Sequence, residues 1–249
     1  MNRLLSILSG AGAGGGGCVA NGATMTGLYS CAENNNCTAS GDSSHAEGDG
    51  STATALAAHA QNWNTLASGV GSSAEGFDTY AESDISHAGG SQAWTLVQTD
   101  FAHASGQFAE RGDAQYRFHE LRGETPGVAV GETVRLRIGN NECDLRPGRV
   151  AAVTATVVAN VVGSDPPEYA QFVRRFVLAC SVGGNATIST VREENDITEG
   201  STLAGSSVLA EATGFDNTWS LTFGLAELTQ ANVRAVAHVE FVELGGVFP

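Results

Sequence analysis

A repeat of 14 residues constrains this chain more than any other feature of its sequence. Five related pentapeptides of the type Ser-His-Ala-Glu-Gly occur between residues 44 and 106. Their central residues are Ala46, Ala60, Ala74, Ala88 and Ala104. These alanines are 14, 14, 14 and 16 residues apart. A short repeat at a fixed period is typical of architectures in which each repeat packs only against its neighbours.

Alanine also recurs at half that period, and we expect these alanines to face inward. They are Ala46, Ala53, Ala60, Ala67, Ala74, Ala81 and Ala88. A seven-residue period can indicate a coiled coil, but a heptad needs two large apolar positions. This stretch is instead rich in Gly, Ser, Thr, Asp and Asn, which disfavour helix interiors. The pattern therefore predicts a β-solenoid over residues 41–115, with one coil per 14 residues, two short strands per coil and a narrow alanine core.

Four histidines occur at places that the pentapeptides make equivalent. They are His45, His59, His87 and His103. We expect a column of stacked rings along the coils. A metal-binding ladder is the alternative, and Ser73 interrupts it because it occupies the histidine place in one coil.

The charge of the chain excludes several function classes. All 12 basic residues are arginine against 27 acidic residues, which gives a net charge of −15. Lysine-dependent Schiff-base and P-loop chemistry is excluded, and so acidic a surface repels nucleic acid. Residues 41–110 contain acidic residues but no Lys or Arg. We therefore predict a solvated acidic face, and we predict no cofactor. Weak Ca²⁺ binding at turn carboxylates is the alternative. The acidic residues are Asp42, Glu47, Asp49, Glu75, Asp78, Glu82, Asp84, Asp100 and Glu110.

The remaining chain divides around the repeats. Residues 1–40 have no clear period and are expected to form an extended attachment segment. Residues 116–131 contain several Gly and Pro residues and are expected to form a linker. From residue 132 the apolar period becomes two, as in Val153–Val161 and Val233–Phe241. This alternation predicts an antiparallel β-sandwich over residues 132–249.

The five cysteines indicate free thiols rather than a disulfide framework, because their number is odd and their spacing is wide. A small loop closed by Cys31 and Cys37 is the alternative.

The pentapeptides at 14-residue spacing resemble the head repeats of trimeric autotransporter adhesins and the repeats of bacteriophage tail-fibre proteins. The resemblance covers about residues 41–112 and implies a left-handed parallel β-roll, three copies of which associate around a three-fold axis. Residues Arg111–Gln115 and Leu121–Thr125 resemble the lead-in to a C-terminal module of phage tail proteins, and Arg234–Glu240 is similar to its ending. The sequence shows no coiled-coil stalk like that of the adhesins, which favours the phage-fibre type.

The resemblance implies a structural and adhesive phage fibre on the virion exterior. It would be a homotrimer without membrane insertion, and we expect no enzymatic activity. Residues 1–40 would dock to tail, baseplate or capsid proteins, and residues 132–249 would face a host glycan or protein. A polysaccharide depolymerase tailspike and a capsid-decorating fibre are the alternatives. The side chains expected to pack across the three-fold axis are Leu56, Trp63, Leu66, Val70, Phe77, Tyr80 and Ile85.

Overall fold

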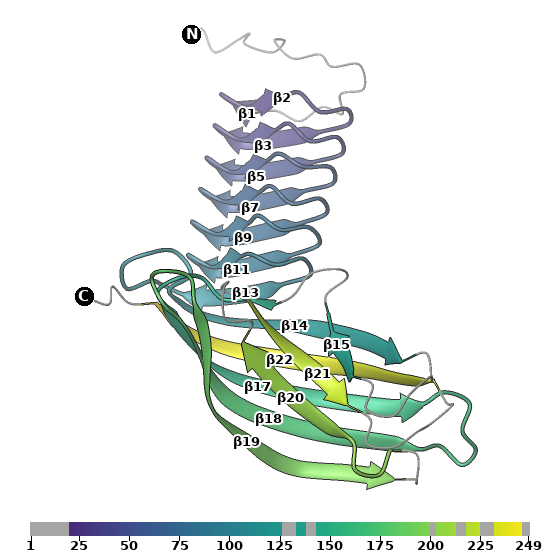
Figure 1. Ribbon diagram of the computed structural model, residues 1–249. Coiled ribbons are helices and arrows are strands. Elements are labelled where there is room, and N and C mark those ends of the chain that lie inside the picture. Colours follow the sequence, from purple (N-terminus) through teal and green to yellow (C-terminus); the bar gives the residue numbers. More distant parts are fainter. Residues whose placement is uncertain are drawn as a thin grey trace, which may run out of the picture. The chain divides into compact units, whose positions relative to one another are not determined.

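The structure, a computed structural model, is built from β-strands throughout its described part (Figure 1). It describes residues 20–125, 133–137, 143–199, 203–212, 218–224 and 232–245. Within these residues there is no helix with the length and apolar character needed to span a membrane. The chain divides into two compact units, Met1–Gln115 and Tyr116–Pro249.

The first unit is a parallel β-solenoid whose coils stack as Figure 1 shows. The longer strands pair in the order β1 (Ala20–Asn21), β3 (Cys31–Asn35), β5 (His45–Asp49), β7 (His59–Trp63), β9 (Ser73–Phe77), β11 (His87–Ser91) and β13 (Phe101–Ser105). The shorter strands form a 6-stranded sheet of β2 (Thr24–Met25), β4 (Thr38–Ala39), β6 (Thr52–Ala53), β8 (Leu66–Ala67), β10 (Tyr80–Ala81) and β12 (Trp94–Thr95). Each pairing joins a residue to the one 14 positions later, as in Ala46↔Ala60. The predicted all-β solenoid of 14-residue coils is therefore confirmed.

The core of the solenoid is a stack of alanines. Each of the seven alanines expected to face inward is 0% exposed. Large side chains do not fit because successive coils approach closely. A Cβ atom added to Gly48 would lie 1.9 Å from the carbonyl oxygen of Asn62, and the φ of Gly48 is +112°. This crowding, together with the left-handed backbone, explains glycine at the fifth place of Ser-His-Ala-Glu-Gly.

Serine and threonine occupy inward positions of the core where there is no alanine. Thr95, which interrupts the alanine frame, is fully buried, and its Oγ1 lies 2.8 Å from Ser86 Oγ. In the same way, Thr65 Oγ1 donates to Ser51 Oγ at 3.0 Å. Polar side chains are accepted in this core because they satisfy one another.

Two features of this unit, and a third at the start of the second unit, correct the sequence analysis. The strands begin at Ala20, so residues 20–40 belong to the solenoid and not to an extended segment, while residues 1–19 lie outside the described residues. The last coil also keeps the 14-residue spacing, since Ala88 pairs with Ala102 and not with Ala104. Ala102 and Ala104 both face inward, at 0% and 2% exposure. The amino-acid pattern alone therefore does not show which of the two pairs with Ala88.

The third correction concerns the expected linker. Residues 116–125 belong to β14 (Ala114–Thr125), whereas residues 126–131 lie outside the described part. The alternating side chains of Arg117, His119 and Leu121 are all buried in β14. Two of these inward residues are charged or polar, and for this reason the strand does not show as an apolar alternation.

The second unit contains two antiparallel sheets. The larger one has the strand order β14, β22 (Val233–Gly245), β17 (Arg149–Val161), β18 (Tyr169–Cys180) and β19 (Ala186–Glu199). In the smaller one β21 (Thr218–Gly224) pairs with β15 (Thr133–Leu136), β16 (Cys143–Asp144) and β20 (Ser207–Ala212). Aromatic side chains join the sheets, since the Trp219 ring lies 5.4 Å from that of Phe176 and 5.7 Å from that of Phe241.

Candidate ligand-binding surface

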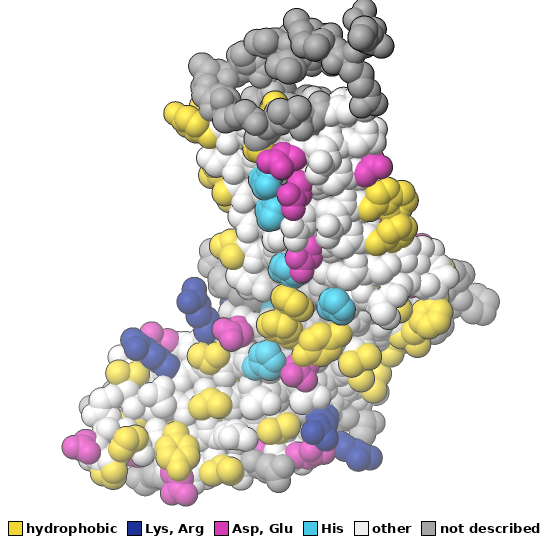
Figure 2. Space-filling model, turned by 180° about the vertical axis from the view of Figure 1, so that it is seen from behind, with side chains coloured by type: hydrophobic (Ala, Val, Ile, Leu, Met, Phe, Trp, Pro, Cys, Tyr) yellow, Lys and Arg dark blue, Asp and Glu magenta, His cyan; other side chains and the backbone are white. Residues whose placement is uncertain are grey.

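The histidines form a column on the outer face of the longer strands. His45 and His59 pair in register, and their rings stack with centroids 5.0 Å apart and 3° between their planes. His87 stacks in the same way on Phe101, at 4.9 Å and 7°. Ser73 separates the two stacks. Figure 2 shows histidines on this face with acidic side chains beside them.

His103 does not belong to this column, which corrects the expected equivalence. It pairs with Gly89, two residues beyond the histidine place, and Phe101 occupies that place in the last coil. The reason is the 14-residue register of the last coil described above.

The fourth place of the pentapeptides carries a second column that contacts the first. Glu75 Oε1 lies 3.3 Å from His87 Nε2, and Glu75 Oε2 accepts a hydrogen bond of 2.8 Å from Gln61 Nε2. Glu33 Oε1 lies 3.8 Å from His45 Nε2. The histidine and glutamate columns thus link successive coils through stacking and polar contacts.

A metal-binding ladder is not supported by this geometry. Among the described residues, one trio brings three potential ligand atoms within 4.8 Å of one another, and it consists of Cys31, Glu33 and His45. Cys31 is disulfide-bonded, however, and its sulfur is therefore not a thiolate ligand.

The cysteines differ from one another in redox state. Cys37 and Cys180 are buried free thiols, as expected, whereas Cys31 forms a disulfide, against expectation. The alternative of a loop closed by Cys31 and Cys37 is excluded because Cys37 is free. Burial raises the pKa of the Cys37 thiol above its usual range.

The turn carboxylates serve as hydrogen-bond acceptors between coils. Asp42 Oδ1 accepts from the backbone N–H of Leu28, and Asp84 Oδ1 accepts in the same way from Val70, both at 2.8 Å. Each bond spans 14 residues, which is one coil. Asp42 and Asp84 thus accept hydrogen bonds from the backbone of the neighbouring coil. These bonds explain why acidic residues occur at the turns, and no bound calcium is needed to explain them.

An aromatic surface lies at the turn that joins the longer strands to the shorter ones. We use this name for Trp63, Phe77, Tyr80 and Trp94. Trp63 and Phe77 end β7 and β9, and they stack at 4.4 Å with 22° between the planes. They remain 48% and 46% exposed. Tyr80 and Trp94 begin β10 and β12 and meet edge to face at 6.2 Å.

Trp63 and Phe77 belong to a longer row, which we call the fifth-place column. It contains the fifth residue of each strand from β3 to β13, one position beyond the pentapeptide glycine, together with the equivalent Asn21. Its members are Asn21, Asn35, Asp49, Trp63, Phe77, Ser91 and Ser105. The amide and carboxylate members are linked, since Asn35 Nδ2 donates to Asp49 Oδ1 at 2.9 Å. The column therefore presents amide, carboxylate, aromatic and hydroxyl groups in succession along one edge of the solenoid.

Polar side chains hold the aromatic surface in place. The guanidinium of Arg111 lies 3.3 Å from the Tyr80 ring centroid, and its Nε donates to the carbonyl oxygen of Asp78 at 2.7 Å. Asp78 Oδ1 also accepts from Asn64 Nδ2 at 2.7 Å. Because these groups are fixed, the rings form a preorganised surface.

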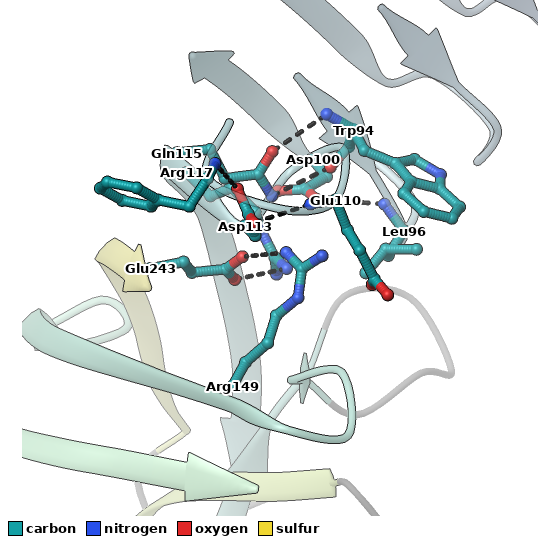
Figure 3. A network of polar contacts seen from close by, with 10 residues as sticks. Trp94, Leu96, Asp100, Glu110, Asp113, Gln115, Arg117, Arg149 and Glu243 are labelled. Atoms are coloured by element: carbon teal, nitrogen blue, oxygen red, sulfur yellow. Dashed lines mark hydrogen bonds and ion pairs between the residues drawn. The ribbon is translucent and has the colours of Figure 1, made fainter. Parts of the chain in front are cut away.

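Gln115 positions Trp94 from the backbone side (Figure 3). Its Oε1 accepts from the Trp94 N–H at 2.9 Å, and its Nε2 donates to the Trp94 carbonyl at 3.1 Å. β12 is the terminal strand of its sheet, so this amide occupies the place of a further strand. In the same segment Asp113 is buried and accepts N–H groups from Phe108, Ala109 and Glu110.

One cluster of charged side chains in the second unit, Arg117, Arg149 and Glu243, is buried rather than presented to a ligand. Arg117 Nη1 lies 2.7 Å from Glu243 Oε1, and both side chains are fully buried. Arg149 approaches the other oxygen of Glu243 at 3.5 Å (Figure 3). Such enclosed ion pairs fix the strand arrangement and have no access to a solute.

The comparisons with known proteins identify structural neighbours only. No protein-family model and no curated protein matches the chain. The tailspike protein of Acinetobacter baumannii phage AM24 matches with 11% identity and a TM-score of 0.38, covering 90% of this chain and 49% of that chain. The tailspike of Acinetobacter phage vB_ApiP_P1 matches with 8% identity and a TM-score of 0.31, covering 90% and 54%.

A third neighbour is tailspike gp49 of A. baumannii phage Fri1, described as a capsular polysaccharide depolymerase. It has 10% identity and a TM-score of 0.27, and the match covers 89% of this chain and 41% of that one. The chain thus spans about half the length of these tailspikes. The expectation that the protein is not an enzyme is contradicted by this neighbour and is withdrawn. No residue role is transferred from these proteins.

Proposed function

We propose that this protein is part of a homotrimeric phage tail fibre or tailspike that attaches to a glycan on the host surface. The observation that carries the proposal is the parallel solenoid of 14-residue coils with an ordered aromatic surface on its exterior. Its narrow alanine core holds little apolar area, whereas large apolar groups lie outside. Exposed apolar groups in contiguous patches are typical of interaction sites.

The trimer is proposed from exposed side chains on the turn opposite the aromatic surface. We name these the apolar row: Leu56, Val70 and Ile85, which are 54%, 44% and 62% exposed. Leu56 and Val70 are 14 residues apart and share one place of the turn, and Ile85 lies one residue beyond that place in the next coil. The seven side chains expected at one three-fold seam thus divide between two turns, and the apolar row is the part that we assign to the contact with a second copy. In a three-fold ring each contact joins two different surfaces, so the row needs no copy of itself opposite.

Attachment to the virion is the remaining part of the proposal. We place the protein on the exterior of the particle, where it contacts other virion proteins. Because the aromatic surface lies on the solenoid, we propose that the solenoid contacts the host, in place of residues 132–249 as expected from the sequence. A capsid-decorating fibre would share this fold, and labelling of intact particles with gold-conjugated antibody distinguishes it from a tail protein. Label at the tail is expected, and label spread over the capsid would contradict a tail location.

The experiment that tests the function combines three measurements on the purified protein. Light scattering should give the mass of three chains. Surface polysaccharide extracted from a susceptible bacterium should bind, as measured by biolayer interferometry. A reducing-end assay on the same polysaccharide measures whether binding is accompanied by cleavage. A monomer, or a protein that binds no polysaccharide from a susceptible host, would contradict the proposal.

A further inference from the structure

We propose that the fifth-place column is the glycan-binding site and that it takes pyranose rings of an uncharged polysaccharide. This inference rests on the proposed function, because it assigns a place and a chemical class to the host glycan. Three observations carry it: the direction of the exposed aromatic faces, the polar groups around them, and the charge of the solenoid.

The stacked pair leaves two aromatic faces open. Near-parallel rings 4.4 Å apart cover one face of Trp63 and one face of Phe77 with each other. The opposite faces turn along the column toward the next coils, where the register places Asp49 beside Trp63 and Ser91 beside Phe77. Both of these neighbours are much smaller than the rings. A flat apolar ring can therefore be received at either end of the stack.

This direction distinguishes a sugar from a protein partner. A protein surface approaching the solenoid from the side would meet mainly the ring edges of Trp63 and Phe77. A pyranose entering the column beside the stack would lay its C–H face on an aromatic face and direct its hydroxyls sideways. Neighbouring parallel strands are about 4.8 Å apart. Contact positions on successive coils are therefore separated by about the length of one sugar ring.

Polar groups lie where those hydroxyls would point. Asp49 Oδ1 is bonded to Asn35, and the column continues with the hydroxyls of Ser91 and Ser105 on the other side of the stack. Asn64 and Asp78 lie one residue beyond the two rings and are themselves hydrogen-bonded. A few fixed polar groups beside aromatic faces are the usual composition of small-ligand sites.

The charge of the solenoid determines the class of sugar. From residue 20 to residue 110 the sequence has ten acidic residues and no basic one. Arg111 follows, and its guanidinium is engaged by Asp78. Uronic and sialic acids would be repelled by this surface and would find no free cation within the column, whereas uncharged hexoses and N-acetylhexosamines would not.

The test compares a variant in the column with a variant at an exposed aromatic residue elsewhere in the first unit. Trp63→Ala removes one aromatic face, Trp63→Phe retains a ring, and Phe108→Ala is the matched control because Phe108 is an exposed aromatic residue that belongs neither to the column nor to the apolar row. The probes are the uncharged fraction of a susceptible host's surface polysaccharide and a uronic-acid polymer. Trp63→Ala should weaken binding of the uncharged fraction about tenfold, which corresponds to about 1.4 kcal/mol. Trp63→Phe and Phe108→Ala should stay within about threefold of the wild type.

Light scattering and thermal melts of each variant separate a lost site from a lost fold. Equal binding by the wild type and folded Trp63→Ala would overturn the site while leaving the proposed function intact. Preferential binding of the uronic-acid polymer would overturn the chemical class. A Trp63→Ala protein that loses its trimer but keeps its affinity would show the surface to be a subunit contact, and would likewise overturn the proposal. If the wild type binds no host polysaccharide, it is the proposed function that fails.

Discussion

The two units of this protein place their large side chains on opposite sides of the backbone. In the solenoid, alanines fill the core and Trp63 and Phe77 lie outside, stacked on one another. In the second unit the largest side chains, among them Trp219 and Phe241, are fully buried between the sheets. The solenoid is held together chiefly by hydrogen bonds and stacking between coils, whereas the second unit is held by the apolar area it buries.

This contrast predicts that the two cores respond oppositely to changes in size. The second unit should be most sensitive to the loss of a large side chain, and the solenoid to the gain of one.

The largest effect is expected for Trp219→Ala in the second unit. Trp219 is 0% exposed and contacts the rings of Phe176 and Phe241, so truncation leaves a cavity. Unfolding by denaturant, followed by near-ultraviolet circular dichroism, should show a loss of about 3–5 kcal/mol.

Trp219→Phe is the matched control for this cavity. No acceptor among the described residues bonds Trp219 Nε1, so removing the indole leaves no partner unsatisfied. The phenylalanine variant should lose clearly less stability than the alanine variant. Equal losses would mean that Trp219 acts through something other than the volume it fills.

The next effect is expected for Ala74→Phe in the solenoid. Ala74 is 0% exposed and pairs with Ala60 and Ala88 in the neighbouring coils, so a larger side chain forces the coils apart. Overpacking should reduce the free energy of unfolding by about 1–3 kcal/mol per site. In the proposed trimer the change occurs three times.

Glu47→Gln is the control, because Glu47 points outward beside the core residue Ala46. Its effect on the melting transition should stay within about 0.5 kcal/mol. If Ala74→Phe melts like the wild type, the core is wider than the alanine stack indicates, and the contrast between the two units is lost.

A smaller, local effect is expected for Gln115→Glu. The carboxylate keeps an acceptor for the Trp94 N–H, but it cannot donate to the Trp94 carbonyl and places negative charge beside it. Loss of one bond and the added repulsion should destabilise this edge by about 1–2 kcal/mol. Hydrogen exchange at Trp94 should become faster, while exchange in β7 stays unchanged. Equal exchange at Trp94 in both proteins would show that Gln115 does not hold the edge.

The smallest effect concerns Cys37 and pH. Burial raises the pKa of its thiol, so the folded state retains a proton that the unfolded state loses first as pH rises. The free energy of unfolding should therefore be unaffected below the pKa of the unfolded thiol, about 8.5, and should decline above it. Cys37→Ser should weaken this decline, and serine is compatible with the site because Ser51 occupies the equivalent place one coil later. An identical pH profile for both proteins would contradict the prediction.

Local pattern allowed much of the fold to be predicted. In the solenoid small inward residues alternate with larger outward ones, and in β17, β21 and β22 apolar residues recur at every second position. Both patterns are local, so the 14-residue coils and these three strands follow from the amino-acid order. For Trp63, Phe77 and Tyr80 the sequence predicts packing at one subunit seam together with Leu56, Val70 and Ile85. Their division between two turns depends on how each coil closes, and composition does not report that.

The period, the solenoid and the alanine positions thus follow from the amino-acid order alone, because a repeat with small residues and turn glycines permits few other structures. The pairing partners depend on the three-dimensional arrangement of the chain. Whether Ala88 pairs with Ala102 or Ala104 and whether residues 20–40 join the stack are decided by which coil lies next to which. β14 was missed for the same reason, since the buried Arg117 depends on Glu243, which is 126 residues away in the chain. Contacts between residues far apart in sequence leave no local periodicity, and these are the contacts that fixed the edges of both units.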